Sequence, residues 1–306
     1  MLSFLIRRIL LTIPALLGVV LLVFSLVHIV PGDPVQIMLG DGAQAADIEQ
    51  LRSRLGLDLP IWEQCFRYLF DLSRGNMGTS FRFGEPVASV IRERYPATLQ
   101  LAFLSLSIGI LLALPAGILA ASQAGRWIDR AITSATLLGI SLPNFVSGPL
   151  AIILFSILLG WLPVSGRQSP LHYVLPALTL GVGFSAILTR MVRAGMIDEL
   201  QEDYIKTARA KGLGESRVYL KHALKNSLIP VITVLGLQFG TLLAGAIITE
   251  TIFSWPGIGR LTVQAINARD YPLVQGCILT IALTYVGVNL LTDLVYGFLD
   301  PRIKYQ

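Results

Sequence analysis

The sequence has few charged residues and few of the side chains that build metal or catalytic centres. Asp, Glu, Lys and Arg make up only 14% of its 306 residues. Its two cysteines, Cys65 and Cys277, lie in unlike segments and provide neither a disulfide framework nor a metal-binding spacing. The three histidines, His28, His172 and His222, are too widely separated for a clustered motif such as HExxH. We therefore expect no metal site in this chain.

The sequence also lacks the motifs of nucleotide-dependent and hydrolytic enzymes. No stretch reads GxxxxGK[ST], so any ATP must be hydrolysed by another protein. Residues Gly181–Ala186 match a dinucleotide fingerprint in their letters. They lie within an apolar run with no preceding strand, which indicates helix packing instead. The apolar runs contain no nucleophile–base pair and no paired carboxylates. We expect a non-catalytic chain that binds no cofactor, and not an integral-membrane enzyme.

Long apolar runs are what the sequence has in abundance. Hydrophobic residues make up 54% of the chain and the mean hydropathy is +0.68, as is typical of a membrane protein. About 20 apolar residues in a helix span a bilayer core. We predict an all-α integral membrane protein with six transmembrane helices. The six runs, each nearly free of charge, are 9–30, 99–122, 131–159, 173–192, 228–250 and 276–299. The first has no cleavage site before VPGDP and is not expected to be a signal peptide.

Basic residues predict the orientation of these helices. Six spans place both termini on one side, and the segments on that side carry 14 Lys and Arg, including all five lysines. The short loops on the other side carry three, Arg167, Arg260 and Arg269. The long 31–98 segment holds seven Arg, but long segments translocate largely regardless of charge. Both termini are therefore expected in the cytoplasm, and the net charge of +5 needs no nucleic-acid partner to explain it.

The predicted spans divide the chain into three parts. Residues 1–30 form the cytoplasmic N-terminus and the first helix, and residues 31–98 form a small helical cap on the periplasmic side. Residues 99–306 form a five-helix core that contains a cytoplasmic coupling loop, 193–227. The cap is expected to pack over the helices, to receive a soluble binding protein, or both. Its predicted features are a capping box at Asp47 and Gln50, a stop at Gly56, helix starts at Pro60 and Pro86, and an end before Pro96.

The segment Ile197–Pro230 is the longest polar stretch in the second half of the chain. Acidic residues precede basic ones, as favoured by a helix dipole, and a glycine follows them as a stop. We expect a first short helix ending at Gly212, supported by a Glu202–Lys206 pair, and a second from about Ser216 to Asn226. The order is Asp198, Glu199, Glu202 and Asp203, then Lys206, Arg209 and Lys211. On helix chemistry alone, the segment is either a charged loop or a docking module.

Outside this segment, polar residues near the apolar runs are candidates for a translocation pathway or gate. They are Glu250 at the outer end of the fifth run, Trp255 in the Trp-Pro-Gly turn that follows, and Asp293 within the sixth run. For Asp293, pairing with Arg302 is the alternative. The loop 251–275 is expected to dip toward a pore or to lie on the surface. Gly236 and Gly240 form a small-residue face for packing against another helix.

The polar segment resembles the cytoplasmic coupling loop of ABC importer permeases. That signature is Glu-Ala-Ala, three residues, Gly, nine residues, Ile, one residue, Leu-Pro. With its glycine on Gly212, only Ala208, Gly212 and Leu224 match the general pattern. The departures, DYIKTARAKGL and KHALKNSLIP, are typical of the dipeptide/oligopeptide/nickel branch. Similar motifs in family order are VPGDP (30–34), LGLDLP (55–60), GNMGTSF (75–81), PATLQLA (96–102), GWLPVSG (160–166), LPALTLG (175–181), ETIFSWPGIGRL (250–261), RDYP (269–272) and DPR (300–302).

The resemblance implies the permease subunit of an ATP-driven importer in the bacterial inner membrane. The chain resembles the first of the two permeases that such systems pair. Its partners would be a second permease, two cytoplasmic ATPases that bind ATP and Mg²⁺, and an external solute-binding protein. Short peptides would be the cargo, with nickel chelates or glutathione as alternatives, and a passive channel is the competing class. The residues implied in contact with an ATPase are Asp203, Tyr204, Lys206, Thr207, Ala208, Arg209, Lys211, Gly212 and Leu224.

Overall fold

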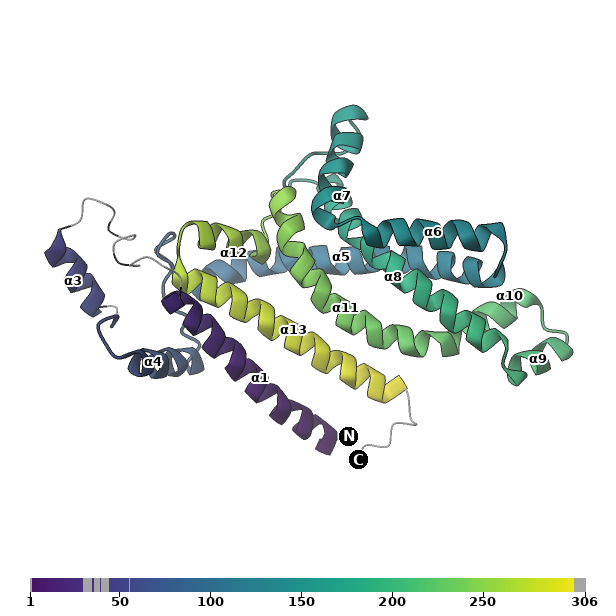
Figure 1. Cartoon of the computed structure of the whole chain (residues 1–306), viewed down its shortest axis with the longest axis horizontal. Helices are drawn as coiled ribbons and strands as arrows, with labels where there is room; N and C mark the ends of the chain where they lie inside the picture. Colours follow the sequence, from purple (N-terminus) through teal and green to yellow (C-terminus); the bar gives the residue numbers. More distant parts are fainter. Residues whose placement is uncertain (1, 30–34, 36–38, 40–43, 55, 300–306) are drawn as a thin grey trace. The chain divides into compact units, whose positions relative to one another are not determined.

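Every regular element in the described part of the chain is a helix. The computed structural model describes residues 2–29, 35, 39, 44–54 and 56–299, and Figure 1 shows their order along the chain. The chain divides into two compact units. One contains residues 1–96 and 257–286, and the other contains residues 97–256 and 287–306. The long helices α5 (Val87–Ser122) and α13 (Tyr271–Leu299) contribute residues to both.

The first unit has its core where α12 (Ile258–Asn267) meets the start of α5 and of α13. Asp270 is fully buried beside this core. It accepts hydrogen bonds from the Ser80 hydroxyl at 2.5 Å and from the Arg82 backbone N–H at 3.0 Å. The core residues are Val87, Val90, Ile91, Ile258, Leu261, Ala265, Leu273 and Cys277. The unit also contains α1 (Leu2–Ile29), α3 (Ala45–Arg54) and α4 (Ile61–Ser73).

Three predicted helix boundaries in this unit are wrong. Helix α3 begins at Ala45, so Asp47 lies in its first turn and is not the N-cap. Its negative charge there interacts favourably with the helix dipole. Pro60 is the residue before α4, not its first residue. The helix that follows Pro86 does not end before Pro96, because it continues as α5. Neighbouring helices can re-satisfy the backbone groups that a proline leaves free. Gly56, with φ +67°, confirms the predicted stop, while VPGDP (30–34) lies outside the described residues.

The loop after the fifth run contains α12, which belongs to the first unit. In α12, Ile258, Leu261 and Ala265 are buried, as expected of an apolar face. Ile266 of the same helix is exposed. Ile266 lies five residues after Leu261, which places it on the opposite side of a helix with 3.6 residues per turn.

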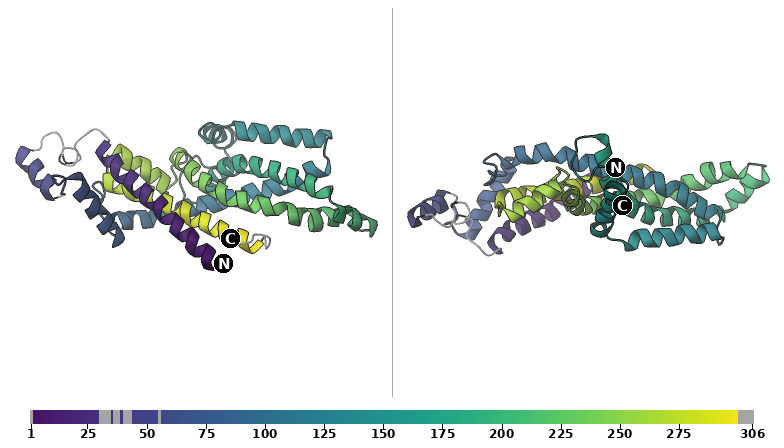
Figure 2. Two further views of the ribbon diagram at one scale, coloured as in Figure 1. Left: turned by 60° about the horizontal axis from the view of Figure 1, so that its bottom comes forward. Right: turned by 90° about the horizontal axis from the view of Figure 1, so that it is seen from above.

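The second unit is organised around α8 (Val174–Leu200). Helix α8 packs against α6 (Trp127–Ser141), α7 (Asn144–Ala151) and α11 (Leu224–Ile252). Figures 1 and 2 show α6, α8 and α11 side by side. Glycines allow α5 to approach α8 closely: a Cβ on Gly181 would lie 2.9 Å from the backbone oxygen of Ser105. The packing interpretation of Gly181 is thus confirmed. Gly236 of α11 similarly packs against Thr292 of α13.

The structure supports part of the predicted set of membrane spans. Among the described residues, three helices are long and apolar enough to cross a membrane, and up to five if each bent pair counts as one span. The predicted span 131–159 is not one straight helix. It breaks at Leu142–Pro143, and α6 makes an angle of 102° with the helix that follows. Pro143 has no N–H to continue α6, and its backbone is extended, with φ −64° and ψ 148°. The count of six and the orientation remain predictions.

Candidate coupling site

The helix α9 (Asp203–Ala210) is a short amphipathic helix that ends at Gly212. The Gly212 N–H donates to the Arg209 carbonyl at 2.9 Å, and the Leu213 N–H donates to the Ala208 carbonyl at 3.3 Å. These two bonds form a Schellman motif, which requires a left-handed residue. Gly212 has φ +78°, a conformation that any residue with a Cβ adopts only at a cost. The predicted helix stop is confirmed.

Helix α9 is held to its unit by one apolar face. Ile205 and Ala208 are buried in a core that includes Val218 and Ala223, while Leu213 packs against the same core. Asp203 and Lys206 lie on the exposed side, with 94% and 67% of their side chains accessible. Thr207, Arg209, Lys211 and Gly212 are also exposed. The helix therefore presents a polar surface about two turns long from a fixed position.

A charged pair spans the turn after α9. The Arg209 guanidinium donates to both carboxylate oxygens of Glu215, at 2.9 and 3.1 Å. Glu215 is the first residue of α10 (Glu215–Arg217), so the pair joins the elements on either side of Gly212. Hydrogen bonding from Arg209 lowers the pKa of Glu215 below its usual range. Glu215 is therefore charged at neutral pH, and the forked pair bridges the two sides of the turn.

Tyr204 connects α9 to two neighbouring helices. Its hydroxyl donates to the carboxylate of Glu199 at the end of α8 and accepts from the Asn226 amide of α11 at 3.0 Å. Burial, then the hydrogen bond to Glu199, raises the pKa of Tyr204 to about 12. The neutral form is thus favoured, and its contribution to stability is lost only as pH rises from about 10 toward about 12. Asn226 lies 22 residues from Tyr204, so no local sequence signal points to this partner.

Several expectations about this segment are wrong in detail. Asp198 and Glu199 do not open the short helix, because α8 continues to Leu200 and carries them in its last turn. Lys206 pairs with Asp203 at 2.8 Å, not with Glu202. The second short helix is not separate either. Helix α10 and the π-helix Val218–Ala223 continue directly into α11, so Leu224 is the first residue of α11. The coupling segment therefore begins within α8 and ends within α11. The turn at 201–202 and the turn at Gly212 lie between these two helices.

A further ion pair joins α6 to α8. The Arg193 guanidinium donates from Nε to Asp129 Oδ1 at 2.5 Å and from Nη2 to Oδ2 at 2.7 Å. Asp129 also accepts from the Gly125 backbone N–H at 2.8 Å and from the Thr133 hydroxyl at 3.4 Å. Asp129 is buried, and this set of four donors compensates for the loss of water around its charge. The two partners lie 64 residues apart, so no local signal points to the pair.

The structure brings two of the three candidate gate residues together. Glu250 is fully buried and accepts from the Thr98 hydroxyl at 2.7 Å. Trp255 is also fully buried, and its Nε1 donates to the Ala97 carbonyl at 2.9 Å. Its ring meets the Tyr173 ring edge to face, with 4.7 Å between the ring centroids. Both therefore attach the end of α11 and its following turn to the same part of α5. Asp293 is half-buried in α13, and its predicted partner Arg302 lies outside the described residues.

The helical elements, the apolar helices and the anchored polar helix agree with a membrane permease of the ABC importer class. The family described as "Binding-protein-dependent transport system inner membrane component" matches residues 113–305. Its N-terminal component family matches residues 1–102. The chain belongs to this family, in the peptide/nickel branch of ABC importer permeases. Members are membrane subunits that are not themselves catalytic, and the apolar helices agree with a multi-pass inner-membrane protein.

Two relatives match over the full length of both chains. The "Glutathione transport system permease protein GsiC" of Escherichia coli O6:H1 (strain CFT073) is 44% identical over 306 residues, covering 100% of each chain. The protein of the same name from Pectobacterium atrosepticum is also 44% identical over 306 residues. Among solved structures, the MetNI methionine ABC transporter matches with a TM-score of 0.58 and 17% identity, over 69% of this chain and 96% of that one. This last likeness concerns the fold alone.

Proposed function

We propose that this chain is the membrane subunit through which two cytoplasmic ATPases drive the import of glutathione. The observation that carries the proposal is α9, a short helix with a buried apolar face and an exposed polar one. Its exposed residues Asp203, Lys206 and Lys211 offer both signs of charge to a groove on a partner. ATP and Mg²⁺ would be bound by the ATPases. A second permease and an external solute-binding protein would complete the importer.

The contacts around α9 explain how its movement would reach the membrane helices. Tyr204 joins it to the end of α8 and the start of α11, and Ile205 fixes it in the core beneath. A partner that pulls α9 therefore moves both long helices together. ATP can shift the permease between inward-open and outward-open states only if the closed ATPase pair binds one state more tightly. The firm attachment of α9 converts that difference in affinity into helix movement.

Glutathione is the proposed cargo because the full-length relatives at 44% identity carry that name. It is a tripeptide and so lies within the class of short peptides that the sequence indicates. Nickel chelates are the other substrate class of the same branch. Uptake of labelled glutathione, of dipeptides and of a nickel chelate by proteoliposomes with the complete importer would separate these cargoes. Uptake of a dipeptide without glutathione would keep the permease role and replace the cargo.

The coupling role is tested by a matched pair of substitutions on either side of Leu213. Gly212→Asp places a side chain at φ +78° and a negative charge at the end of α9, where the helix dipole disfavours it. Gly214→Asp adds the same charge at the N-cap of α10, where φ is −64° and Asp is a favoured capping residue. Neither Cβ would meet an atom within 4 Å, so both variants are expected to insert and fold.

We expect Gly212→Asp to lose most cargo-stimulated ATPase activity in proteoliposomes at normal membrane levels, while Gly214→Asp keeps it. The turn at Gly212, and not an added negative charge as such, would then be what coupling requires. Equal activity in both variants would remove the proposed role of the Gly212 turn. Transport that needs no ATPase subunit at all would return the chain to the passive-channel class.

A further inference from the structure

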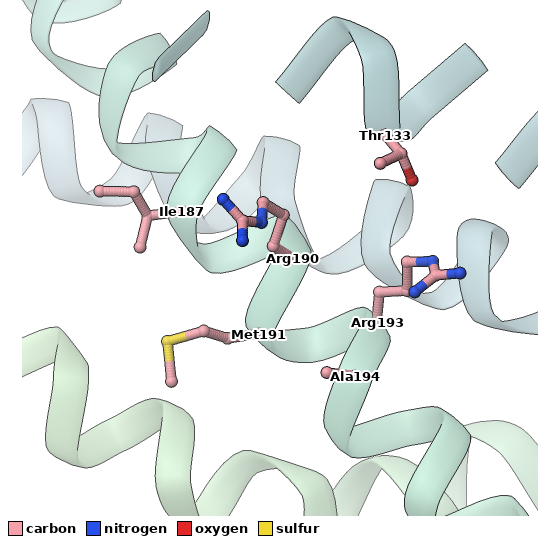
Figure 3. Close-up of a pocket in the computed structure, with 6 residues that line it drawn as sticks. All are labelled: Thr133, Ile187, Arg190, Met191, Arg193 and Ala194. Atoms are coloured by element: carbon pink, nitrogen blue, oxygen red, sulfur yellow. The ribbon is translucent and has the colours of Figure 1, made fainter. Parts of the chain in front are cut away.

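A pocket between α6 and α8 contains an arginine that the coupling role does not use. The pocket has a volume of about 470 Å³ and is lined by Thr133, Ile187, Arg190, Met191, Arg193 and Ala194. Figure 3 shows that Arg190 and Arg193 leave α8 in different directions. Ile187, Arg190, Met191 and Ala194 follow the spacing of one helix face. The pocket thus has a cationic group, a hydroxyl and an apolar wall.

The two arginines differ in their partners. Arg193 is neutralised by Asp129 through two hydrogen bonds. Arg190 is exposed and makes no ion pair or side-chain hydrogen bond with any residue in the described part of the chain. Arg190 lies near the cytoplasmic end of the fourth predicted span, 173–192. A cation within a span is costly unless an anion or water surrounds it, and such residues often mark substrate pathways. Arg190 therefore places an unneutralised positive charge in the pocket.

The location of the pocket favours a solute over the surrounding lipid. Of the three long candidate spans, α8 is the most buried, with 56% of its apolar window covered against 33% for α5 and 22% for α13. Helices α6, α7 and α11 pack around it, and α5 approaches it through Gly181. Arg190 is thus carried by the central helix of its unit. Charged side chains in membrane helices typically face the bundle interior or a water-filled cavity.

We propose that Arg190 binds a carboxylate of the substrate as it passes through the permease. The inference rests on the proposed import function and adds to it a residue that contacts cargo. A guanidinium can hold a carboxylate through two parallel N–H···O bonds, which lysine cannot reproduce. Thr133, whose hydroxyl proton is directed at Asp129, can still accept a hydrogen bond from an N–H of the same ligand. Ile187 and Met191 pack against the ligand's apolar part. A single ion pair in a water-filled pocket binds weakly enough for the substrate to leave again.

The first test measures the charge of the pocket and needs no knowledge of the cargo. Ala194→Cys introduces a thiol on the pocket wall, one helical turn from Arg190, in a Cys65→Ser background; Cys277 is buried. The full importer in nanodiscs reacts with an anionic and a cationic methanethiosulfonate of similar size, and mass spectrometry follows the introduced thiol. One charge at roughly 6 Å in water changes each rate about threefold, in opposite directions. Arg190→Gln should therefore lower the anion-to-cation rate ratio about tenfold.

Arg130→Gln serves as the matched control. It removes the same charge from an exposed position of α6 that does not line the pocket, and it should leave the ratio nearly unchanged. An anion-to-cation rate ratio that Arg190→Gln leaves unchanged, or a thiol that neither reagent reaches, would overturn the proposal. A lipid phosphate is the other source of an anion at this site. Reaction that appears only when anionic lipids are left out of the nanodiscs would assign Arg190 to lipid instead.

The second test adds a cargo whose thiol is blocked. S-methylglutathione should slow modification of the introduced thiol, and its diethyl ester, which lacks both negative carboxylates, should not. Arg190→Gln should abolish the protection and Arg190→Lys should weaken it. Protection by the ester as well would exclude the carboxylate contact. A charged pocket that S-methylglutathione fails to protect would reject glutathione as the ligand, while the first test still reports on the anion site itself.

Discussion

Two carboxylate–cation pairs in this protein have similar lengths but different surroundings. Asp203 and Lys206 form a 2.8 Å pair on the outside of α9, where both side chains are largely exposed. Hydrogen bonding to Lys206 lowers the pKa of Asp203. Exposed pairs nevertheless contribute little, because water and salt screen them. Asp129 and Arg193 form a forked pair in which only 5% of the Asp129 side chain is accessible. The same contact therefore has a different energetic weight at the two sites.

Asp129→Asn should destabilise the protein by about 2 kcal/mol, because the half-buried Arg193 loses its charged, hydrogen-bonded partner. Asp203→Asn makes the same chemical change in the exposed pair and should leave stability nearly unchanged. Thermal unfolding of the purified protein in one detergent measures both. Equal midpoints for the two variants would show that the Asp129–Arg193 pair does not hold α6 to α8.

At the scale of elements, close packing of α5 on α8 depends on glycines. A Cβ on Gly181 would lie 2.9 Å from a backbone oxygen of Ser105 and 3.0 Å from Ile108 Cγ2. Backbone atoms cannot move aside as a flexible side chain can, so the two helices would have to separate. Gly18 of α1 lies in a helix too, but a Cβ there would meet nothing within 4 Å. Alanine substitutions at Gly181 and Gly18 therefore distinguish the effect of close packing from the effect of helix propensity.

Gly181→Ala should therefore cost about 1–3 kcal/mol, the range for overpacking a tight contact. Gly18→Ala should be neutral or stabilise α1 by up to about 1 kcal/mol, because alanine favours the helix interior. The amount of folded protein recovered from membranes and its thermal midpoint in detergent report both effects. Loss of stability at Gly18 and none at Gly181 would contradict the assigned packing of α5 on α8.

Which elements could be predicted depended on whether their signals are local. The stop at Gly212 was predictable, because only glycine adopts φ +78° at little cost and charges of opposite sign bracket the helix before it. The continuation of α5 through Pro96 was not, because proline is a local stop signal that packing overrides. The length of α8 was underestimated because polar residues 198–199 resemble a loop. Window averages of hydropathy do not detect helix ends of that kind.

The site was predictable only in outline, for a related reason. The exposed residues of α9 carry a sequence signature, and the structure places them on one short helix. The partners that fix the helix, Glu199 and Asn226 around Tyr204, come from elements that meet only in the folded chain. Arg190 is one of the 14 basic residues expected on the cytoplasmic side. Only the fold shows that its neighbour Arg193 pairs with Asp129 while Arg190 does not.

At the scale of the whole molecule, the break between α6 and α7 determines the topology. The chain bends by 102° at Leu142–Pro143, as in a broken span or a re-entrant loop. A broken span that still crosses the membrane places residues 123–126 and 163–169 on opposite sides. A re-entrant loop places them on the same side and inverts every later segment. Six crossings then become five, and the two termini lie on opposite sides.

Reporter fusions after Gly125, after Gly166 and at the C-terminus distinguish these cases. We expect a cytoplasmic reporter to be active after Gly125 and at the C-terminus, and a periplasmic one after Gly166. The charge distribution is the reason, because the loops predicted in the cytoplasm hold all five lysines. A periplasmic C-terminus with both internal fusions cytoplasmic would establish the re-entrant loop. It would also place α9 outside, where no ATPase could reach it. The coupling role therefore requires that a reporter inserted between Leu200 and Glu215 be cytoplasmic.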